Sequence, residues 1–221
     1  MNKANKRYVI PVLIIALLAG MVILAGCSDD DDPVRVVSEP IVRPETADEL
    51  MNQFRSVYEA LDVNNYLALL DPGFLMILQE ETIWDFPRLG GTLDYQEEER
   101  IHRRMFSGEL VTDPEGTFVP GVQRIEFSIL MALTEWAPSD NKDIFPDTEW
   151  AAFAVNLLFD RGESYSTMKA EGTLKIYVRA YEVEVDGTNK TYYMMAGMEE
   201  LSNVVKSTES ASWGGVKALY R

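Results

Sequence analysis

His102 is the only histidine in this chain of 221 residues, and histidine is the side chain best suited to acid–base chemistry near neutral pH. It shares a predicted helical face with Tyr95 and Phe106, so we expect its ring to point inward. A carboxylate that orients the imidazole would make it a general base, and we pair it with Asp85. The candidate catalytic pair is therefore Asp85 and His102. The commoner alternative is a partly buried histidine held by one hydrogen bond, with no catalytic role.

Five aromatic side chains are candidates for the lining of a small-molecule pocket. Apolar walls with a few polar groups are typical of sites that bind small molecules. The candidates are Tyr66, Trp84, Phe86, Tyr95 and Trp150. The alternative, which the sequence favours, is that these rings belong to ordinary core and lid packing.

The sequence contains no other pattern that indicates a reaction. It has no cluster of cysteine and histidine, no glycine-rich phosphate loop and no nucleophile elbow, so we predict no metal and no cofactor. The run QEEER at 96–100 is most simply a solvated helix face with ion pairs along the helix. Met194, Met195 and Met198 are interpreted as packing residues.

The single cysteine, Cys27, lies between an apolar run and four aspartates. Lys3, Lys6 and Arg7 precede an uncharged stretch from Tyr8 to Gly26, which is typical of a secretory signal. The stretch is also long enough for a membrane-spanning helix, so an uncleaved anchor is the alternative. A lone cysteine excludes an internal disulfide framework.

The residues LAGC at 24–27 resemble the lipobox of bacterial lipoproteins. The resemblance implies a lipidated Cys27, cleavage before it, and attachment to the membrane through the acylated residue. It divides the chain into a signal peptide (1–26), an acidic, proline-containing tether (27–45) and a domain (46–221). Ser28 resembles the sorting pattern for the outer membrane rather than the inner one. The acidic residues that follow resemble a surface-export tether, with a plain solvated spacer as the alternative.

The charge balance limits the partners of this protein. Asp and Glu number 36 against 20 Lys and Arg, which gives a net charge of −16. Proteins bind nucleic acid by neutralising phosphates with Lys and Arg, so we exclude nucleic acid as a partner. The lipid rather than surface charge must then hold the protein to a membrane.

Hydrophobic periodicity predicts helices in the first half of the domain. Thr46 with Glu49 forms a capping-box pattern that starts a helix over 46–61. A short helix at 65–70 and a short apolar run at 74–79 follow. Residues 80–91 are expected to be irregular, and Asp94 caps a further helix that ends before Gly108.

After Gly121 the apolar residues recur at every second position, which predicts strands. Alternating runs begin near 122, 149 and 168, and Asp186-Gly187 is a hairpin signal that pairs the third run with 190–201. Gly172 and Gly197 inside the strands indicate bulges or bends. The predicted fold class is α+β, with N-terminal helices packed on a curved antiparallel sheet of at least four strands.

The segment ADELMNQFRSVYEALDVNNYLALLDPGF at 47–74 resembles the opening of domains similar to nuclear transport factor 2, also called SnoaL-like domains. The resemblance extends over 46–221 and implies a cone-like, cystatin-like architecture with an interior pocket. It also implies that a homodimer can form through the sheet. Enzymes of this group often place an Asp or His in the cone. This chain departs from them in having one histidine and few ionisable residues at apolar positions.

These features together predict a lipid-anchored envelope protein with a non-enzymatic domain that binds a small apolar ligand or another envelope component. One alternative is a small-molecule isomerase or dehydratase that uses Asp85 and His102. The other is a purely structural envelope protein with a filled core. A pocket that contains His102 with a carboxylate favours the enzyme, a pocket without such a pair favours binding, and no pocket favours the structural role.

Overall fold

The computed structural model describes residues 42–113, 115–201 and 210–221, which belong to one compact unit, Ser38–Arg221. The predicted signal peptide, the lipidation site Cys27 and the acidic tether lie outside the described residues. In the part that is described, no helix has the length and apolar character needed to cross a membrane.

Helices and strands of this unit follow the order that the sequence predicts, with several additions. The helices are α2 (Ala47–Glu59), α3 (Val63–Ala68), α4 (Glu80–Asp85), the 3₁₀ turn η1 (Pro87–Leu89), α5 (Tyr95–Met105) and α6 (Trp213–Leu219). The strands are β1 (Leu70–Ile77), β2 (Thr92–Asp94), β3 (Val111–Thr112), β4 (Phe118–Val119), β5 (Arg124–Ala132), β6 (Ala137–Pro138), β7 (Glu149–Asp160), β8 (Met168–Val185), β9 (Thr188–Leu201) and β10 (Ser210–Ala211).

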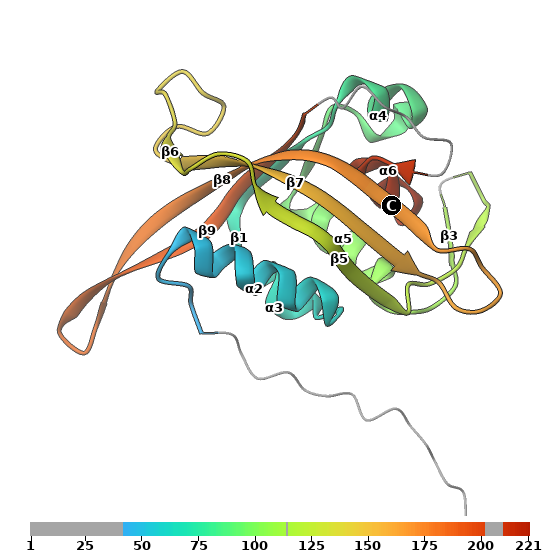
Figure 1. Cartoon of the computed structure of the whole chain (residues 1–221), viewed down its shortest axis with the longest axis horizontal. Helices are drawn as coiled ribbons and strands as arrows, with labels where there is room; N and C mark the ends of the chain where they lie inside the picture. Colours follow the sequence, from blue (N-terminus) through green and yellow to red (C-terminus); the bar gives the residue numbers. More distant parts are fainter. Residues whose placement is uncertain (1–41, 114, 202–209) are drawn as a thin grey trace, which may run out of the picture. The chain divides into compact units, whose positions relative to one another are not determined.

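Within the described ranges, eight strands form one curved sheet (Figure 1). Its order is β2-β1-β9-β8-β7-β5, with β6 beside β7 and β10 beside β8. Strands β5, β7, β8 and β9 are antiparallel neighbours, as predicted. The sheet is mixed rather than purely antiparallel, because β1 and β10 join it in parallel.

Helices α2, α3, α5 and α6 bury their apolar faces against one side of this sheet. One continuous core joins them to the inward residues of β5, β7 and β8, the last of these including Leu174, Ile176 and Val178. The α+β prediction is therefore confirmed. The alternation that begins at 168 places Ala180 on the inward face, but Ala180 is exposed, because β8 and β9 extend beyond the helices as a long hairpin (Figure 1).

The first helix starts where the sequence predicts, whereas the second, Val63–Ala68, begins two residues before the expected 65 and ends before the expected 70, because the chain enters β1 at Leu70. Thr46 Oγ1 accepts the backbone N–H of Glu49, and Asp62 Oδ1 accepts that of Asn65. Such caps stabilise a helix by roughly 1 kcal/mol each. The carboxylate of Glu49 reaches the backbone N–H of Glu45, one residue before the cap that the capping box assumes.

Two segments that were expected to be irregular or unassigned are helical. Residues 80–91 hold α4 and η1, and the C-terminal run WGGVKALYR holds α6. Both α helices have fewer than eight residues, too short to show a clear period in the sequence. They form because other elements hold them in place.

Two bulges shape the sheet next to the helices. The pairing of β8 with β9 shifts after Tyr177, beside Gly197, as the glycine predicts, whereas the register at Gly172 is regular. The pairing of β5 with β7 shifts between Phe127 and Ile129. Beyond this second shift, Leu130 rather than Ile129 packs on the core, so the predicted alternation of β5 reverses.

Candidate functional site

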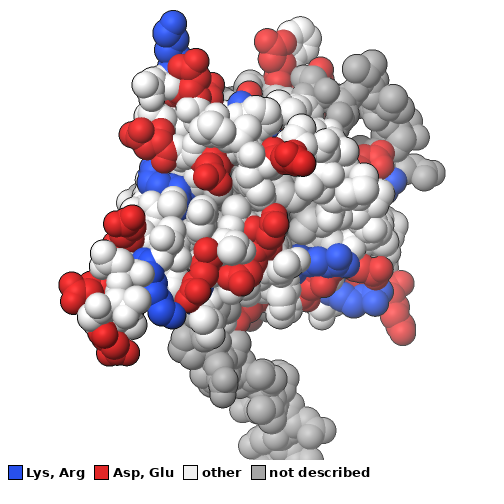
Figure 2. Space-filling view, turned by 60° about the vertical axis from the view of Figure 1, so that its left-hand side comes forward, with Lys and Arg blue, Asp and Glu red and all other residues white. Residues whose placement is uncertain are grey.

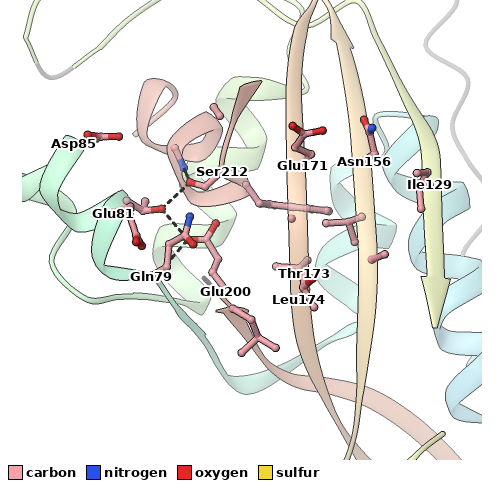
Figure 3. A pocket seen from close by; sticks show the side chains of 18 of the residues that line it. Gln79, Glu81, Asp85, Ile129, Asn156, Glu171, Thr173, Leu174, Glu200 and Ser212 are labelled. Atoms are coloured by element: carbon pink, nitrogen blue, oxygen red, sulfur yellow. Dashed lines mark hydrogen bonds between the residues drawn. The ribbon is translucent and has the colours of Figure 1, made fainter. Parts of the chain in front are cut away.

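A pocket of about 680 Å³ opens between helices α4 and α6 and the strands β5, β7 and β8 (Figure 3). Small-molecule sites typically enclose about 300–1,000 Å³. Gln79, Glu81 and Asp85 lie on the α4 side, while Glu171 and Asn156 lie across from them on neighbouring strands. The size and the position between helices and sheet make this the candidate binding site.

Glu200, near the end of β9, holds the two helical walls of this pocket together. Its carboxylate Oε2 accepts the hydroxyl of Thr82 at 2.9 Å and the backbone N–H of Gln79 at 3.2 Å. Its other oxygen accepts the backbone N–H of Gly214, at the start of α6, at 2.6 Å. A single buried carboxylate therefore fixes α4 against α6.

The opposite wall comes from strand residues that combine apolar and polar groups. Ile129 and Ala154 contribute apolar surface, while Asn156 and Thr173 contribute polar groups. The Oδ1 atom of Asn156 is buried and has no hydrogen-bond donor among the described residues. A buried acceptor without a donor is costly, and a bound molecule could supply the missing donor.

The charged residues among the described lining of the pocket are all acidic. They are Glu81, Asp85, Glu171 and Glu200, and no Lys or Arg is among the described lining residues. Figure 2 shows acidic side chains spread over another face of the same unit as well. The pocket therefore disfavours anionic molecules.

A second group of chemically active side chains lies deeper, behind α6. The carboxylate of Glu98 on α5 forms an ion pair with Lys217 of α6, with Oε1 and Nζ 2.6 Å apart. Glu98 Oε2 accepts the hydroxyl of Tyr66 at 2.9 Å. The ring of His102 lies between Glu98 and Tyr58. All five side chains, those of Tyr58, Tyr66, Glu98, His102 and Lys217, are fully buried.

The hydrogen bonds of His102 indicate a neutral ring. Nδ1 lies 2.8 Å from the backbone oxygen of Glu98 and 3.1 Å from its carboxylate, so Nδ1 carries the proton. Nε2 then accepts the hydroxyl of Tyr58 at 2.9 Å. Burial lowers the pKa of His102, although the Glu98 carboxylate opposes this shift.

Glu98 and Lys217 are the two charged groups of the cluster, one negative and one positive. Burial alone would raise the pKa of Glu98, but Lys217 and His102 lower it to about 2. Burial lowers the pKa of Lys217, against the attraction of Glu98. Burial also raises the pKa of Tyr58 and of Tyr66, with Glu98 adding to both shifts. The cluster is therefore electrically balanced near neutral pH.

The structure does not bring the predicted catalytic residues into one cluster. His102 is fully buried, both of its ring nitrogens are engaged, and its nearest carboxylate is Glu98. Asp85 is exposed on α4 and lines the pocket, whereas His102 does not. A catalytic role for Asp85 and His102 stays a prediction, with Glu98 in the position that was assigned to Asp85.

The predicted pocket aromatics are also dispersed. Phe86 lines the pocket, whereas Trp84 is 82% exposed and Tyr66 lies in the interior. Tyr95 packs on the edge of the core. Trp150 belongs to a separate cluster with Phe145 and Tyr177 and holds the ammonium of Lys175 above its ring. Their part in ligand binding likewise stays a prediction.

Sequence reasoning missed Glu98, Lys217, Glu200 and Trp213. Glu98 precedes His102 by four residues and so shares its helical face, which was the available signal. It was hidden inside QEEER, a run that was interpreted as solvated. The other three become neighbours of Glu98, Thr82 and Phe54 only through the tertiary fold. The described ranges hold no group of acidic, cysteine or histidine side chains suited to a metal ion.

Comparisons with known proteins give structural likenesses at low sequence identity. No family model matches the chain, and no curated protein sequence matches it significantly. The β subunit of a Burkholderia mallei benzoate 1,2-dioxygenase is 13% identical, covers 72% of this chain and 91% of its own, and has a TM-score of 0.46.

Two further solved structures are similar. One is described as a putative aromatic ring hydroxylase from Novosphingobium aromaticivorans, with 10% identity, 69% and 83% coverage and a TM-score of 0.42. The other is described as a putative polyketide cyclase from Pseudomonas putida, with 12% identity, 72% and 92% coverage and a TM-score of 0.37. Identities and TM-scores this low transfer no role to this chain, whose fold is the α+β arrangement described above.

Proposed function

We propose that this domain binds a small molecule in the pocket between α4, α6 and the sheet, without changing it chemically. The observation that carries the proposal is a pocket of about 680 Å³ whose wall contains a buried acceptor, Asn156 Oδ1, with no donor among the described residues. A ligand that donates a hydrogen bond to Asn156 would remove this cost.

The lining narrows the chemical class of the ligand. Ile129, Ala154 and Leu174 offer apolar contact, whereas the carboxylates of Glu81 and Asp85 stand at the α4 side. We infer an amphipathic molecule that is neutral or positively charged and carries at least one hydrogen-bond donor. This proposal differs from the small apolar ligand expected from the sequence in requiring a polar group on the ligand.

The enzyme alternative requires a substrate to reach His102. The side chain of His102 has no exposed surface, and its two ring nitrogens already have partners. A general base must lie within hydrogen-bond reach of the proton that it removes. The position of His102 therefore favours binding over catalysis in this conformation.

We further propose that a lipid on Cys27 attaches the domain to the bacterial envelope, with the outer membrane favoured over the inner. This proposal is supported by the residues LAGC at 24–27, the basic start and the apolar run before them. The role is then capture of a small molecule close to a membrane surface.

Native mass spectrometry of the protein purified from its own envelope tests the binding role. A non-covalent adduct of small-molecule mass is expected in the wild type. Ala154→Trp places a large ring on the pocket wall and is expected to abolish the adduct. Ala180→Trp puts the same ring on an exposed part of β8 outside the pocket and is expected to keep it.

Two results would speak against the proposal. An adduct that persists in Ala154→Trp would place the ligand elsewhere. A wild-type protein that carries no adduct from its native membrane would favour the structural alternative.

A further inference from the structure

Helix α6 separates the pocket from the buried charged cluster and contributes to both. Ser212, Trp213 and Gly215 line the pocket. Trp213 also stacks on Phe54 with ring centroids 5.9 Å apart, and Lys217 pairs with Glu98 in the interior. A movement of α6 away from the core would therefore change the pocket lining and separate Lys217 from Glu98 at the same time.

The intrinsic stability of α6 is low, so tertiary contacts must hold it. The helix has seven residues, and two of them are Gly214 and Gly215, which disfavour helix. Gly214 allows close packing, since a Cβ there would lie 2.6 Å from Leu78 Cδ2 and 3.0 Å from Glu200 Oε2, and these side chains would have to shift. The glycine that allows close packing therefore also lowers the helix propensity of α6.

Buried polar contacts at both ends hold α6 in place. Glu200 accepts the N–H of Gly214, and Glu98 accepts the ammonium of Lys217. After the helix, Arg221 forms a part-buried ion pair with Glu97 and also reaches the backbone oxygen of Arg88. Of these two ion pairs only Glu98–Lys217 is fully buried, so its loss would leave an unscreened charge in the interior.

Two carboxylates and two tyrosine hydroxyls surround Lys217 and His102. Glu98 and His102 face Lys217 from α5, and Glu200 faces it from β9. Tyr58 from α2 and Tyr66 from α3 complete the cluster with neutral hydroxyls. A proton on His102 places a second positive charge beside Lys217, and a proton on Glu98 removes the anion that pairs with Lys217. Glu200 does not replace that anion, because its carboxylate is hydrogen-bonded to Thr82 and Gly214.

We propose that α6 is an acid-sensitive latch, which leaves the interior when the buried cluster gains a proton and thereby opens the ligand pocket. The proposal rests on the binding function proposed above and adds its regulation: the ligand is held near neutral pH and released in acid.

The direction of the pH effect on the closed state follows from the protonation of His102 in the closed and open states. In the closed state burial lowers the pKa of His102, so the ring stays neutral. With α6 released the ring meets water and takes a proton below its ordinary pKa of about 6.5. The open state then binds more protons than the closed one, so the closed state loses stability as pH falls below that value.

Hydrogen exchange of the full-length protein in detergent tests the latch without knowledge of the ligand. Amides of α6 are expected to lose protection by up to about tenfold per pH unit below about pH 6.5, after correction for the intrinsic exchange rate. Amides of β7 and β8 serve as the internal control and are expected to keep theirs. Constant protection in α6, or a parallel loss in all three elements, would overturn the proposal.

Two variants connect the effect to the cluster. His102→Asn removes the titrating ring, and Lys217→Met removes the charge that opposes its protonation. Each is expected to abolish the loss of α6 protection between about pH 6.5 and 5. In Lys217→Met this is because Glu98 then favours a protonated His102 in the closed state as well. If one variant does not fold, the other still tests the proposal. A dependence that survives in a folded variant of either kind would contradict the proposed cause.

The failure of the latch and the failure of the binding role are distinguishable. Native mass spectrometry at about pH 7.5 reports whether any adduct is present, and at about pH 5.5 whether it has left. If α6 exchange rises in acid but no adduct is found at either pH, the binding role alone is refuted. An adduct that remains bound after α6 exchange has risen would refute the regulation alone.

Discussion

At the scale of single residues, the interior of the fold contains an ion pair, although burying charges costs desolvation free energy. Glu98 and Lys217 are both fully buried and 2.6 Å apart. Desolvation opposes such a pair, and the mutual attraction together with the hydroxyl of Tyr66 offsets it. We therefore expect the pair to fix the position of α6 against α5 more than to add net stability to the fold.

Removal of one partner should cost more than removal of both. Lys217→Met leaves the Glu98 carboxylate buried without its cation, and we expect a loss of roughly 3–5 kcal/mol in the free energy of unfolding. The double variant Glu98→Gln/Lys217→Met should lose clearly less, since no charge is stranded. Urea unfolding of the three proteins measures both values. A double variant less stable than Lys217→Met would show that the Glu98 carboxylate is stabilised by its contacts with Tyr66 and His102 even without its cation.

At the scale of elements, close approaches between loops and strands set the curvature of the sheet. The loop between β6 and β7 places Phe145 on the side of the sheet away from the helices, against Tyr177 at a centroid distance of 4.5 Å. Gly197 makes room for this ring at the bulge of β9. Next to the other bulge, Glu59 and Arg55 of α2 bond the backbone N–H and oxygen of Phe127, which protects the edge strand β5.

Gly197→Ala should disrupt this contact. The added methyl would lie 2.2 Å from Phe145 Cζ, so the ring and its loop must shift, at a cost of roughly 1–3 kcal/mol. Gly91→Ala is the matched control, because its nearest neighbour, Ile83 Cδ1, is 3.8 Å away. Thermal unfolding compares the two. Equal unfolding temperatures for the two variants would show that Phe145 and its loop can shift without a loss of stability.

Local pattern was enough to predict the long elements and not enough to predict the site. The helices capped by Thr46, Asp62 and Asp94 and the hairpin at Asp186-Gly187 each depend on residues within a few positions, so the sequence carries their signal. Helices α4 and α6 depend on Glu200, which is distant from α4 in sequence. The pocket that they form was therefore not predictable from periodicity.

The same reasoning explains why burial on α5 was predicted for His102 but not for Glu98. His102 was expected inward and is inward, whereas Glu98 was expected in solvent and is fully buried. A buried glutamate is predicted only if its cation is known, and Lys217 lies 119 residues away. Charge pairing over that distance is a property of the fold.

At the scale of the whole molecule, the acidic surface and the proposed anchor belong together. With a net charge of −16 the protein would not approach anionic head groups unaided, so a covalent lipid is the means of attachment that we propose. The intact mass of the mature protein tests this. We expect a chain that begins at Cys27 and carries acyl mass, and a Cys27→Ser variant that keeps residues 1–26 and carries none. A wild-type chain that retains residues 1–26 without acyl mass would contradict the anchor.

The central claim is that the space between α4, α6 and the sheet holds a ligand. A crystal structure of the protein isolated from its native envelope, without refolding or added ligand, tests it most directly. The account predicts density for a small molecule that donates a hydrogen bond to Asn156 and contacts Ala154, with His102 still enclosed behind α6. Density for solvent or for the chain's own residues in that space, or a ligand bound at His102, would contradict it.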